Sequence, residues 1–61
     1  MGQLMEKIYT VDEIAGILDL DGATVRRYFR EKRFPGSFKI GTNWRLAESD
    51  LVKWIEKKKG E

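Results

Sequence analysis

Hydrophobic residues recur along the first half of the chain at spacings that predict a helix, a tight turn and a second helix. The first stripe, with the i, i+3, i+4, i+7 spacing of a helix, consists of Val11, Ile14, Ala15 and Leu18. It predicts a helix over Tyr9–Leu18, where Thr10 and Glu13 match the capping box that begins many helices. Residues 19–22 interrupt the stripe, and Asp21 is the expected N-cap of the next helix.

The second helix is predicted over Gly22–Glu31, with one apolar and one cationic side. Its apolar side carries Val25, Tyr28 and Phe29. Its opposite side carries Ala23, Arg27 and Arg30, flanked by Thr24 and Arg26. Pro35 and Gly36 end regular structure after this helix. We therefore expect a short helix whose exposed side is rich in arginine.

A β-hairpin is the next predicted element. Its two strands are Phe38–Ile40 and Trp44–Leu46. A three-residue loop would place Ile40 opposite Trp44. Lys39 would then lie opposite Arg45, and all apolar side chains of the hairpin would share one face, whereas a two-residue loop would mix the faces. We therefore predict the three-residue loop, in which Asn43 takes the left-handed conformation.

A last helix is predicted over Glu48–Lys58, and it completes a small core. Its apolar stripe consists of Leu51, Trp54 and Ile55. The expected core residues are Val11, Ile14, Leu18, Val25, Phe29, Phe34, Ile40, Trp44, Leu51, Trp54 and Ile55. Trp44 is assigned to the core because its strand position points inward, and stacking on a nucleic-acid base is its alternative role. The order of elements predicts a mainly α fold with a small β-hairpin, which is a winged helix-turn-helix.

Length and composition limit the classes of function. Sixty-one residues form at most one domain, which we predict over residues 1–61 with an ordered core at about 8–58. The absence of cysteine and histidine excludes zinc sites built from these residues and histidine-based catalysis. No stretch approaches the roughly 20 apolar residues that span a bilayer. We therefore expect a cytoplasmic protein that is not an enzyme and has no catalytic residues, metal or cofactor.

The formal net charge of +2 hides an uneven distribution of charge along the chain. Residues 1–25 carry one lysine against five acids, and residues 46–61 are balanced. The cations of the middle third are Arg26, Arg27, Arg30, Lys32, Arg33, Lys39 and Arg45, against the single acid Glu31. This block of net charge +6 favours an anionic partner over a merely solvated face, since five of its seven cations are arginines.

The first two predicted helices have the spacing of a helix-turn-helix, whose second helix enters the major groove of DNA. In that helix the candidate DNA contacts are Ala23, Thr24, Arg26, Arg27 and Arg30. In the hairpin they are Lys39, Thr42, Asn43 and Arg45. In the predicted register Lys39 and Arg45 repel each other, and a polyanion alongside would remove this penalty. The sequence therefore predicts double-stranded DNA as the partner.

Several short motifs occur in a characteristic order along most of the chain. They are Tyr9–Thr10, Glu13–Ala15, Thr24–Arg27, Phe34–Pro35, Ile40–Gly41, Trp44–Leu46 and Asp50–Trp54. Together they resemble the excisionase-type, MerR-related winged helix-turn-helix domains. Two turns depart from that family, because Asp19 and Lys32 stand where glycine is common, although aspartate tolerates a left-handed conformation. The resemblance implies that Arg27 and Arg45 are the principal DNA contacts.

The resemblance also implies a recombination directionality factor, which binds and bends DNA so that an integrase or recombinase excises a mobile element. A small MerR-like transcription regulator and a protein-interaction adaptor are the alternatives. One recognition helix covers too few base pairs for a genomic target, and all apolar stripes are assigned to the core. We therefore predict a monomer in free solution that assembles cooperatively on DNA, encoded by a bacterium or phage and associated with the nucleoid.

Overall fold

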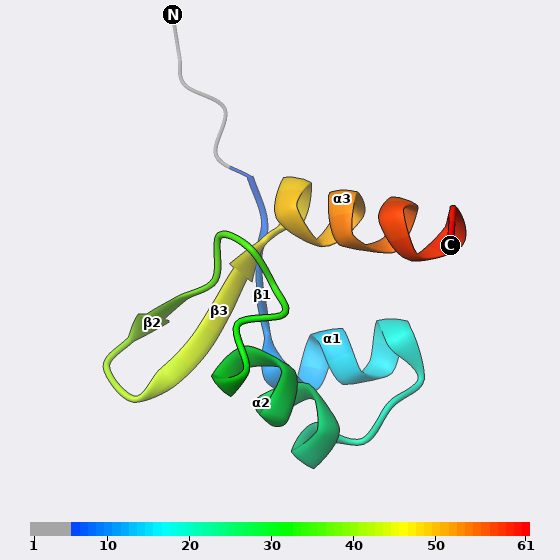
Figure 1. Cartoon of the computed structure of the whole chain (residues 1–61). Coiled ribbons are helices and arrows are strands. Elements are labelled where there is room, and N and C mark those ends of the chain that lie inside the picture. Colours follow the sequence, from blue (N-terminus) through cyan, green and yellow to red (C-terminus); the bar gives the residue numbers. More distant parts are fainter. Residues whose placement is uncertain (1–5) are drawn as a thin grey trace, which may run out of the picture.

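The computed structural model describes residues 6–61, which form three helices and a three-stranded antiparallel sheet (Figure 1). In chain order the elements are β1 (Ile8–Thr10), α1 (Val11–Leu18), α2 (Gly22–Arg30), β2 (Phe38–Ile40), β3 (Asn43–Ala47) and α3 (Glu48–Lys59). The strand order in the sheet is β1-β3-β2. The predicted winged helix-turn-helix is confirmed, with element bounds met to within two residues and β1 as an additional strand. Residues 1–5 of the predicted domain lie outside the described residues.

The helix-turn-helix begins at caps that the sequence predicts. The hydroxyl of Thr10 accepts a hydrogen bond from the Glu13 N–H at 3.2 Å, and Glu13 Oε1 accepts one from the Thr10 N–H at 3.0 Å. Because Thr10 is the N-cap, α1 begins at Val11 and not at the predicted Tyr9. Asp21 caps α2, where its carboxylate accepts a hydrogen bond from the third N–H of the helix at 3.1 Å.

Two residues that stand in place of glycine adopt the left-handed conformation. Asp19 ends α1 with a φ of 58°, as its tolerance of this conformation predicts. Lys32 follows α2 with a φ of 62°. The N–H groups of Lys32 and Arg33 donate to carbonyl groups of the last turn of α2 at 3.1 and 2.9 Å, which is a Schellman arrangement. The helix therefore ends at Arg30, and Glu31, predicted as its last residue, is the C-cap.

The hairpin turn contains two residues, so the predicted three-residue loop is wrong. The strand pairs are Ile40 with Asn43, Lys39 with Trp44 and Phe38 with Arg45. Gly41 has a φ of +65° at the first turn position, which is typical of the type II′ turn that matches the twist of the flanking strands. The left-handed residue is thus Gly41, and Asn43 begins β3.

This register divides the hairpin between an inner and an outer face. Lys39 lies on the inner face, with its Nζ 4.5 Å from the centroid of the Trp44 ring. Phe38 and Ile40 share the outer face with Arg45 and are 39% and 56% exposed. The predictions that Ile40 enters the core and that Lys39 opposes Arg45 are therefore wrong. The conformational preference of the turn outweighs the grouping of apolar side chains.

The core lies where the helices pack against the sheet. Its buried residues are Ile14, Val25, Phe29, Phe34, Leu46 and Leu51. Leu46, which the predicted core omits, is fully buried. Trp44 packs against the core as expected, and its ring stacks on Phe29 with centroids 5.2 Å apart. Large apolar side chains remain exposed at Ile8, Ile17, Phe38, Ile40 and Val52. None of these exposed residues belongs to a predicted helical stripe, and the stripes themselves lie in the core or pack against it, as expected.

The segment that contains β1 also completes the start of α3. The N-cap of α3 is Ala47, whose side chain cannot accept a hydrogen bond. Instead, Glu6 Oε1 accepts a hydrogen bond from the Ser49 N–H at 2.8 Å, and the carbonyl of Lys7 accepts one from the Glu48 N–H at 2.9 Å. The hydrogen bond from the backbone of Ser49 lowers the pKa of Glu6. The pairing of β1 in the sheet and these two hydrogen bonds to Glu6 and Lys7 together hold the start of α3 against the sheet.

Candidate nucleic-acid interface

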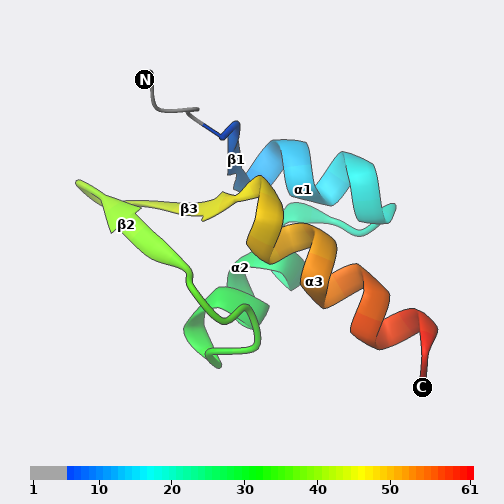
Figure 2. The ribbon, with the colours of Figure 1, turned by 90° about the horizontal axis from the view of Figure 1, so that it is seen from above.

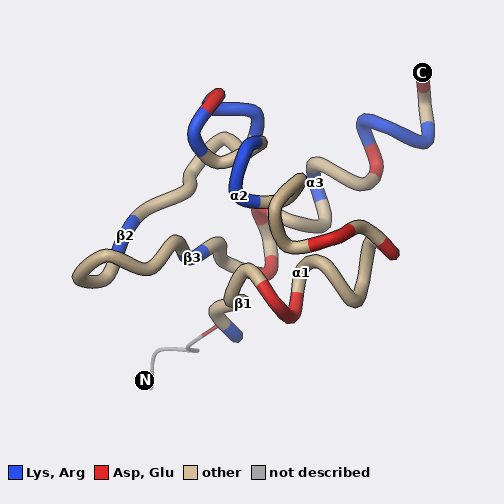
Figure 3. Tube along the Cα trace, turned by 90° about the horizontal axis from the view of Figure 1, so that it is seen from below, with Lys and Arg blue, Asp and Glu red and all other residues tan. Residues whose placement is uncertain are grey.

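The outer side of α2 is a row of exposed residues with three arginines. Val25 and Phe29 are fully buried, so the opposite side of the helix faces solvent. The exposed residues of that side are Ala23, Arg26, Arg27 and Arg30. Thr24 lies half-buried beside them in the first turn. In Figure 3, basic residues lie on α2, on the segment after it, on the hairpin and at the end of α3, whereas acidic residues lie on α1 and the turn after it, with others on α3.

Arg27, the predicted base contact, forms an ion pair at the surface. Its Nε lies 4.0 Å from Glu31 Oε2, and Arg33 Nε donates a hydrogen bond to Glu31 Oε1 at 2.8 Å. The Arg27 and Glu31 side chains are 55% and 44% exposed. Exposed ion pairs contribute less than about 1 kcal/mol, so Arg27 can exchange Glu31 for a phosphate or a base edge at little cost.

A cleft of about 370 Å³ lies between the hairpin, the start of α1 and the middle of α2. Its lining residues are Thr10, Val11, Asp12, Arg26, Thr42, Asn43, Trp44 and Arg45. Four of the residues predicted to contact DNA, from α2 and from the hairpin, therefore meet in one place. Thr10 and Asp12 were not predicted to line this cleft. The sequence did not indicate them, because their proximity to Arg45 depends on the pairing of β1 with β3, and β1 was not predicted.

Arg45 and Lys39 are held in place by different contacts on opposite faces of the hairpin. Arg45 is half-buried, and its Nη1 donates a hydrogen bond to the carbonyl of Trp44 at 3.1 Å. Lys39 lies over the Trp44 ring in a cation–π contact, outside the cleft. The structure thus places Arg45 and Arg26 in the lining of one cleft, and it does not bring Lys39 into that cleft.

The carboxylates at the starts of the two helices are already engaged in capping. Hydrogen bonds from the side chain and backbone of Thr24 lower the pKa of Asp21. The hydrogen bond from the Thr10 N–H lowers the pKa of Glu13, and Lys7, with its Nζ 3.7 Å from Glu13 Oε2, adds to the effect. These acids stay ionised at neutral pH, so cationic groups of α2 and the hairpin must supply the attraction for a polyanion.

The chain matches a known protein family. The model of the helix-turn-helix domain family, a family of excisionase-like DNA-binding domains, matches residues 8–59. No curated protein and no solved structure matches the chain. Proteins of this family are typically non-enzymatic, and membership implies sequence-specific binding to DNA. Among residues 6–61, no helix has the length and apolar character needed to cross a membrane. The chain belongs to the helix-turn-helix domain family of excisionase-like DNA-binding domains.

Proposed function

We propose that the chain is a recombination directionality factor that places α2 in the major groove of DNA and the hairpin on the adjoining backbone. The observation that carries this proposal is the shared cleft, because Arg26 of α2 and Arg45 of the hairpin line it together. Helix and hairpin thus form one cationic surface. A major groove about 12 Å wide accepts such a helix.

In this arrangement the first turns of α2 approach the base edges. Ala23 is small enough for close approach, Thr24 can bond a base or a phosphate, and Arg27 can make a bidentate contact with guanine. The backbone contacts are assigned to Arg26, Arg30, Lys39, Thr42, Asn43 and Arg45. Base contacts by α2 would then set the sequence preference, and the remaining groups would set the affinity and the register on the duplex.

Selection of bound duplexes from a random-sequence library, followed by titration at several salt concentrations, tests DNA binding. If about five cations engage phosphates, log K should fall with log[salt] with a slope of roughly −4 to −5. An enriched sequence motif with a slope in this range supports the proposal. A flat response to salt, or a folded chain that binds no duplex, would refute it and would favour a protein-interaction adaptor.

The proposed role in excision requires several copies on one DNA, because one recognition helix reads few base pairs. We infer a monomer in free solution that loads cooperatively onto repeated sites and bends the duplex for an integrase or recombinase. Sedimentation of the free chain and titrations onto duplexes with one and with two selected sites test this. A stable dimer without DNA, or independent binding to adjacent sites, would contradict it. Binding without bending would favour a small transcription regulator.

A further inference from the structure

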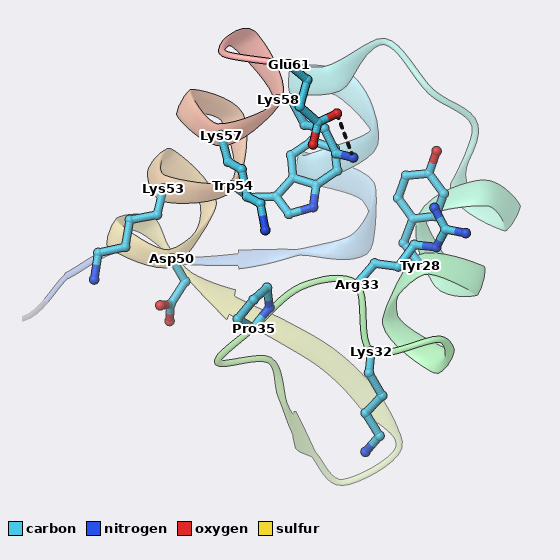
Figure 4. A pocket seen from close by; sticks show the side chains of 10 residues that line it. All are labelled: Tyr28, Lys32, Arg33, Pro35, Asp50, Lys53, Trp54, Lys57, Lys58 and Glu61. Atoms are coloured by element: carbon cyan, nitrogen blue, oxygen red, sulfur yellow. Dashed lines mark hydrogen bonds and ion pairs between the residues drawn. The ribbon is translucent and has the colours of Figure 1, made fainter.

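A second hollow, of about 630 Å³, lies between α3 and the segment that follows α2 (Figure 4). It is lined by Tyr28, Lys32, Arg33, Pro35, Asp50, Lys53, Trp54, Lys57, Lys58 and Glu61. Five of these residues are cations and two are acids, so the lining has a net charge of +3. None of them lines the cleft beside the hairpin. Figure 2 shows α3 between α1 on one side and segment 31–37 on the other, which is the side of the hollow.

This hollow between α3 and segment 31–37, called the groove from here on, has an aromatic floor and cationic rims. The rings of Tyr28 and Trp54, both half-buried, lie 6.2 Å apart between centroids, and Phe34 supports Trp54 at 5.1 Å. The guanidinium carbon of Arg33 lies 5.2 Å from the centroid of Tyr28, and Nζ of Lys58 lies 5.6 Å from that of Trp54. Cations therefore stand beside each exposed ring.

We propose that this groove is a docking site for an acidic segment of a partner protein. One apolar side chain of that segment would pack on Tyr28 and Trp54, as an anchor residue fills a pocket at the centre of an interface. Flanking carboxylates would pair with Lys53, Lys57 and Arg33, which extend from both walls. The groove and the cleft share no lining residue, so the proposed docking site does not use the cleft between α2 and the hairpin.

Charge and shape favour an acidic peptide over the DNA backbone. Asp50 and Glu61 lie within the groove, and they would repel a phosphate backbone, which carries a negative charge at every step. A peptide can instead place its apolar side chain there and keep its carboxylates beside the cations of the rims. The carboxylate of Asp50 lies so close to Gly36 that a Cβ there would collide with it, which places this acid firmly against segment 31–37. A duplex also has no side chain to fill an aromatic floor, whereas a peptide does.

A second copy of this chain is a poor occupant, because most of its acids are engaged elsewhere and the rest do not form a continuous acidic segment. The carboxylates of Glu6, Glu13 and Asp21 accept backbone hydrogen bonds at the starts of helices. Asp12 lines the cleft beside the hairpin. Among the other acids of residues 6–61 outside the groove, Glu31 pairs with Arg27 and Arg33, and the remaining three are spread over the turn after α1 and the length of α3: Asp19, Glu48 and Glu56. A different protein with a continuous acidic segment fits better.

The test is an NMR titration of the full chain with a blocked peptide in which glutamates flank a single phenylalanine. We expect the Trp54 indole and Tyr28 ring signals to shift, with a Kd of roughly 10–100 μM. Replacing the glutamates by glutamine should weaken binding about tenfold, since the rims supply the charge. The double variant Lys53→Glu, Lys57→Glu should do the same. The matched control is Lys59→Glu, in the same last turn but outside the groove, and its effect should stay below about twofold.

Other outcomes overturn the proposal. The peptide could fail to shift these signals, or the glutamine peptide could bind equally well, which would leave an apolar patch without charge recognition. The same signals could move with protein concentration alone, which would indicate self-association, or with a short mixed-sequence duplex, which would make the groove a phosphate contact. The titration contains no DNA. Failure of DNA binding would therefore refute the proposed function and leave this result intact.

Discussion

Replacing Glu31 by glutamine is expected to raise the affinity for duplex DNA. Glu31 is the single acid of residues 26–45, and its carboxylate lies 4.0 Å from Arg27 Nε and 2.8 Å from Arg33 Nε. Neutralising it raises the net charge of this block by one, from +6 to +7, and frees Arg27, a proposed DNA contact, from its ion pair. Glu31 is also the C-cap of α2, where a negative charge opposes the helix dipole. The change should therefore not destabilise the helix.

The size of the effect follows from counterion release. Each phosphate neutralised on B-DNA adds about −0.9 to the slope of log K against log[salt]. One further phosphate contact at about 0.1 M salt would thus raise the affinity by up to about eightfold and steepen the slope by up to about 0.9. The ion pairs of Glu31 are exposed and cost less than about 1 kcal/mol to break, so part of this gain is already available to the unmodified chain. We expect an increase of about two- to eightfold.

Fluorescence anisotropy with a labelled mixed-sequence duplex at several salt concentrations measures both quantities. The matched control is Glu56→Gln, which removes the same charge from an exposed position of α3. Its effect should be much smaller, because Glu56 lies outside the cationic block. An affinity for Glu31→Gln equal to or below that of Glu56→Gln would refute the reasoning. It would mean that Glu31 orients Arg27 for binding and does not compete with the DNA for it.

Three further predictions concern specificity, pH and the core. Arg27→Ala should reduce discrimination between DNA sequences by about 1–3 kcal/mol, whereas Arg45→Ala should weaken specific and non-specific binding alike. Competition titrations measure both effects. If Arg27→Ala lost the same affinity for all sequences, the assignment of α2 as the recognition helix would be wrong. The pKa values of Glu13 and Asp21 are lowered from 4.5 and 3.8 in the folded state, so the stability they contribute is present above these values and is lost as the pH falls below them. A thermal midpoint that does not change on acidification from neutral pH to below these values would disprove it. Phe34 is 1% exposed and contacts three aromatic rings, so Phe34→Ala should lower the free energy of unfolding by about 3–5 kcal/mol and unfold much of the population. The variant Phe34→Leu should stay folded, with a lower urea midpoint than the unmodified chain.

The helix-turn-helix could be predicted from the sequence because its signals are local. The capping box of Thr10 and Glu13 and the N-cap Asp21 act on N–H groups three residues away, so short motifs suffice to place both helix starts. Burial of Val25 and Phe29 then decides which side of α2 faces solvent. The arginine-rich face follows from the same helical period, without knowledge of the rest of the fold.

The sheet could not be predicted in the same way, because its geometry depends on pairings between distant residues. Ile8–Thr10 is too short to display a period of two, and its partner β3 lies far along the chain. In the hairpin, two rules gave opposite answers. Gathering apolar residues on one face favoured a three-residue loop, whereas Gly41 at the first position of a two-residue turn favoured the observed register. The two-residue turn is adopted because Lys39 can lie over the Trp44 ring on the inner face with its ammonium group in solvent. The cation is therefore not desolvated, and this register carries no penalty that would favour the other one.

The strand that the sequence did not reveal is also the one that orients the hairpin relative to the recognition helix. Thr10 pairs with Arg45 in the sheet, and the side chain of Thr10 caps α1 in the next step of the chain. Because α1 packs directly on α2, Thr10 links the strand that carries Arg45 to the helix that carries Arg26. A different register of β2 against β3 would change the positions of Lys39 and Ile40, but it would not change the pairing of Thr10 with Arg45. The strand β1 therefore joins the strand that carries Arg45 to the start of α1, and in this way it contributes to the spacing of Arg26 and Arg45 across the cleft.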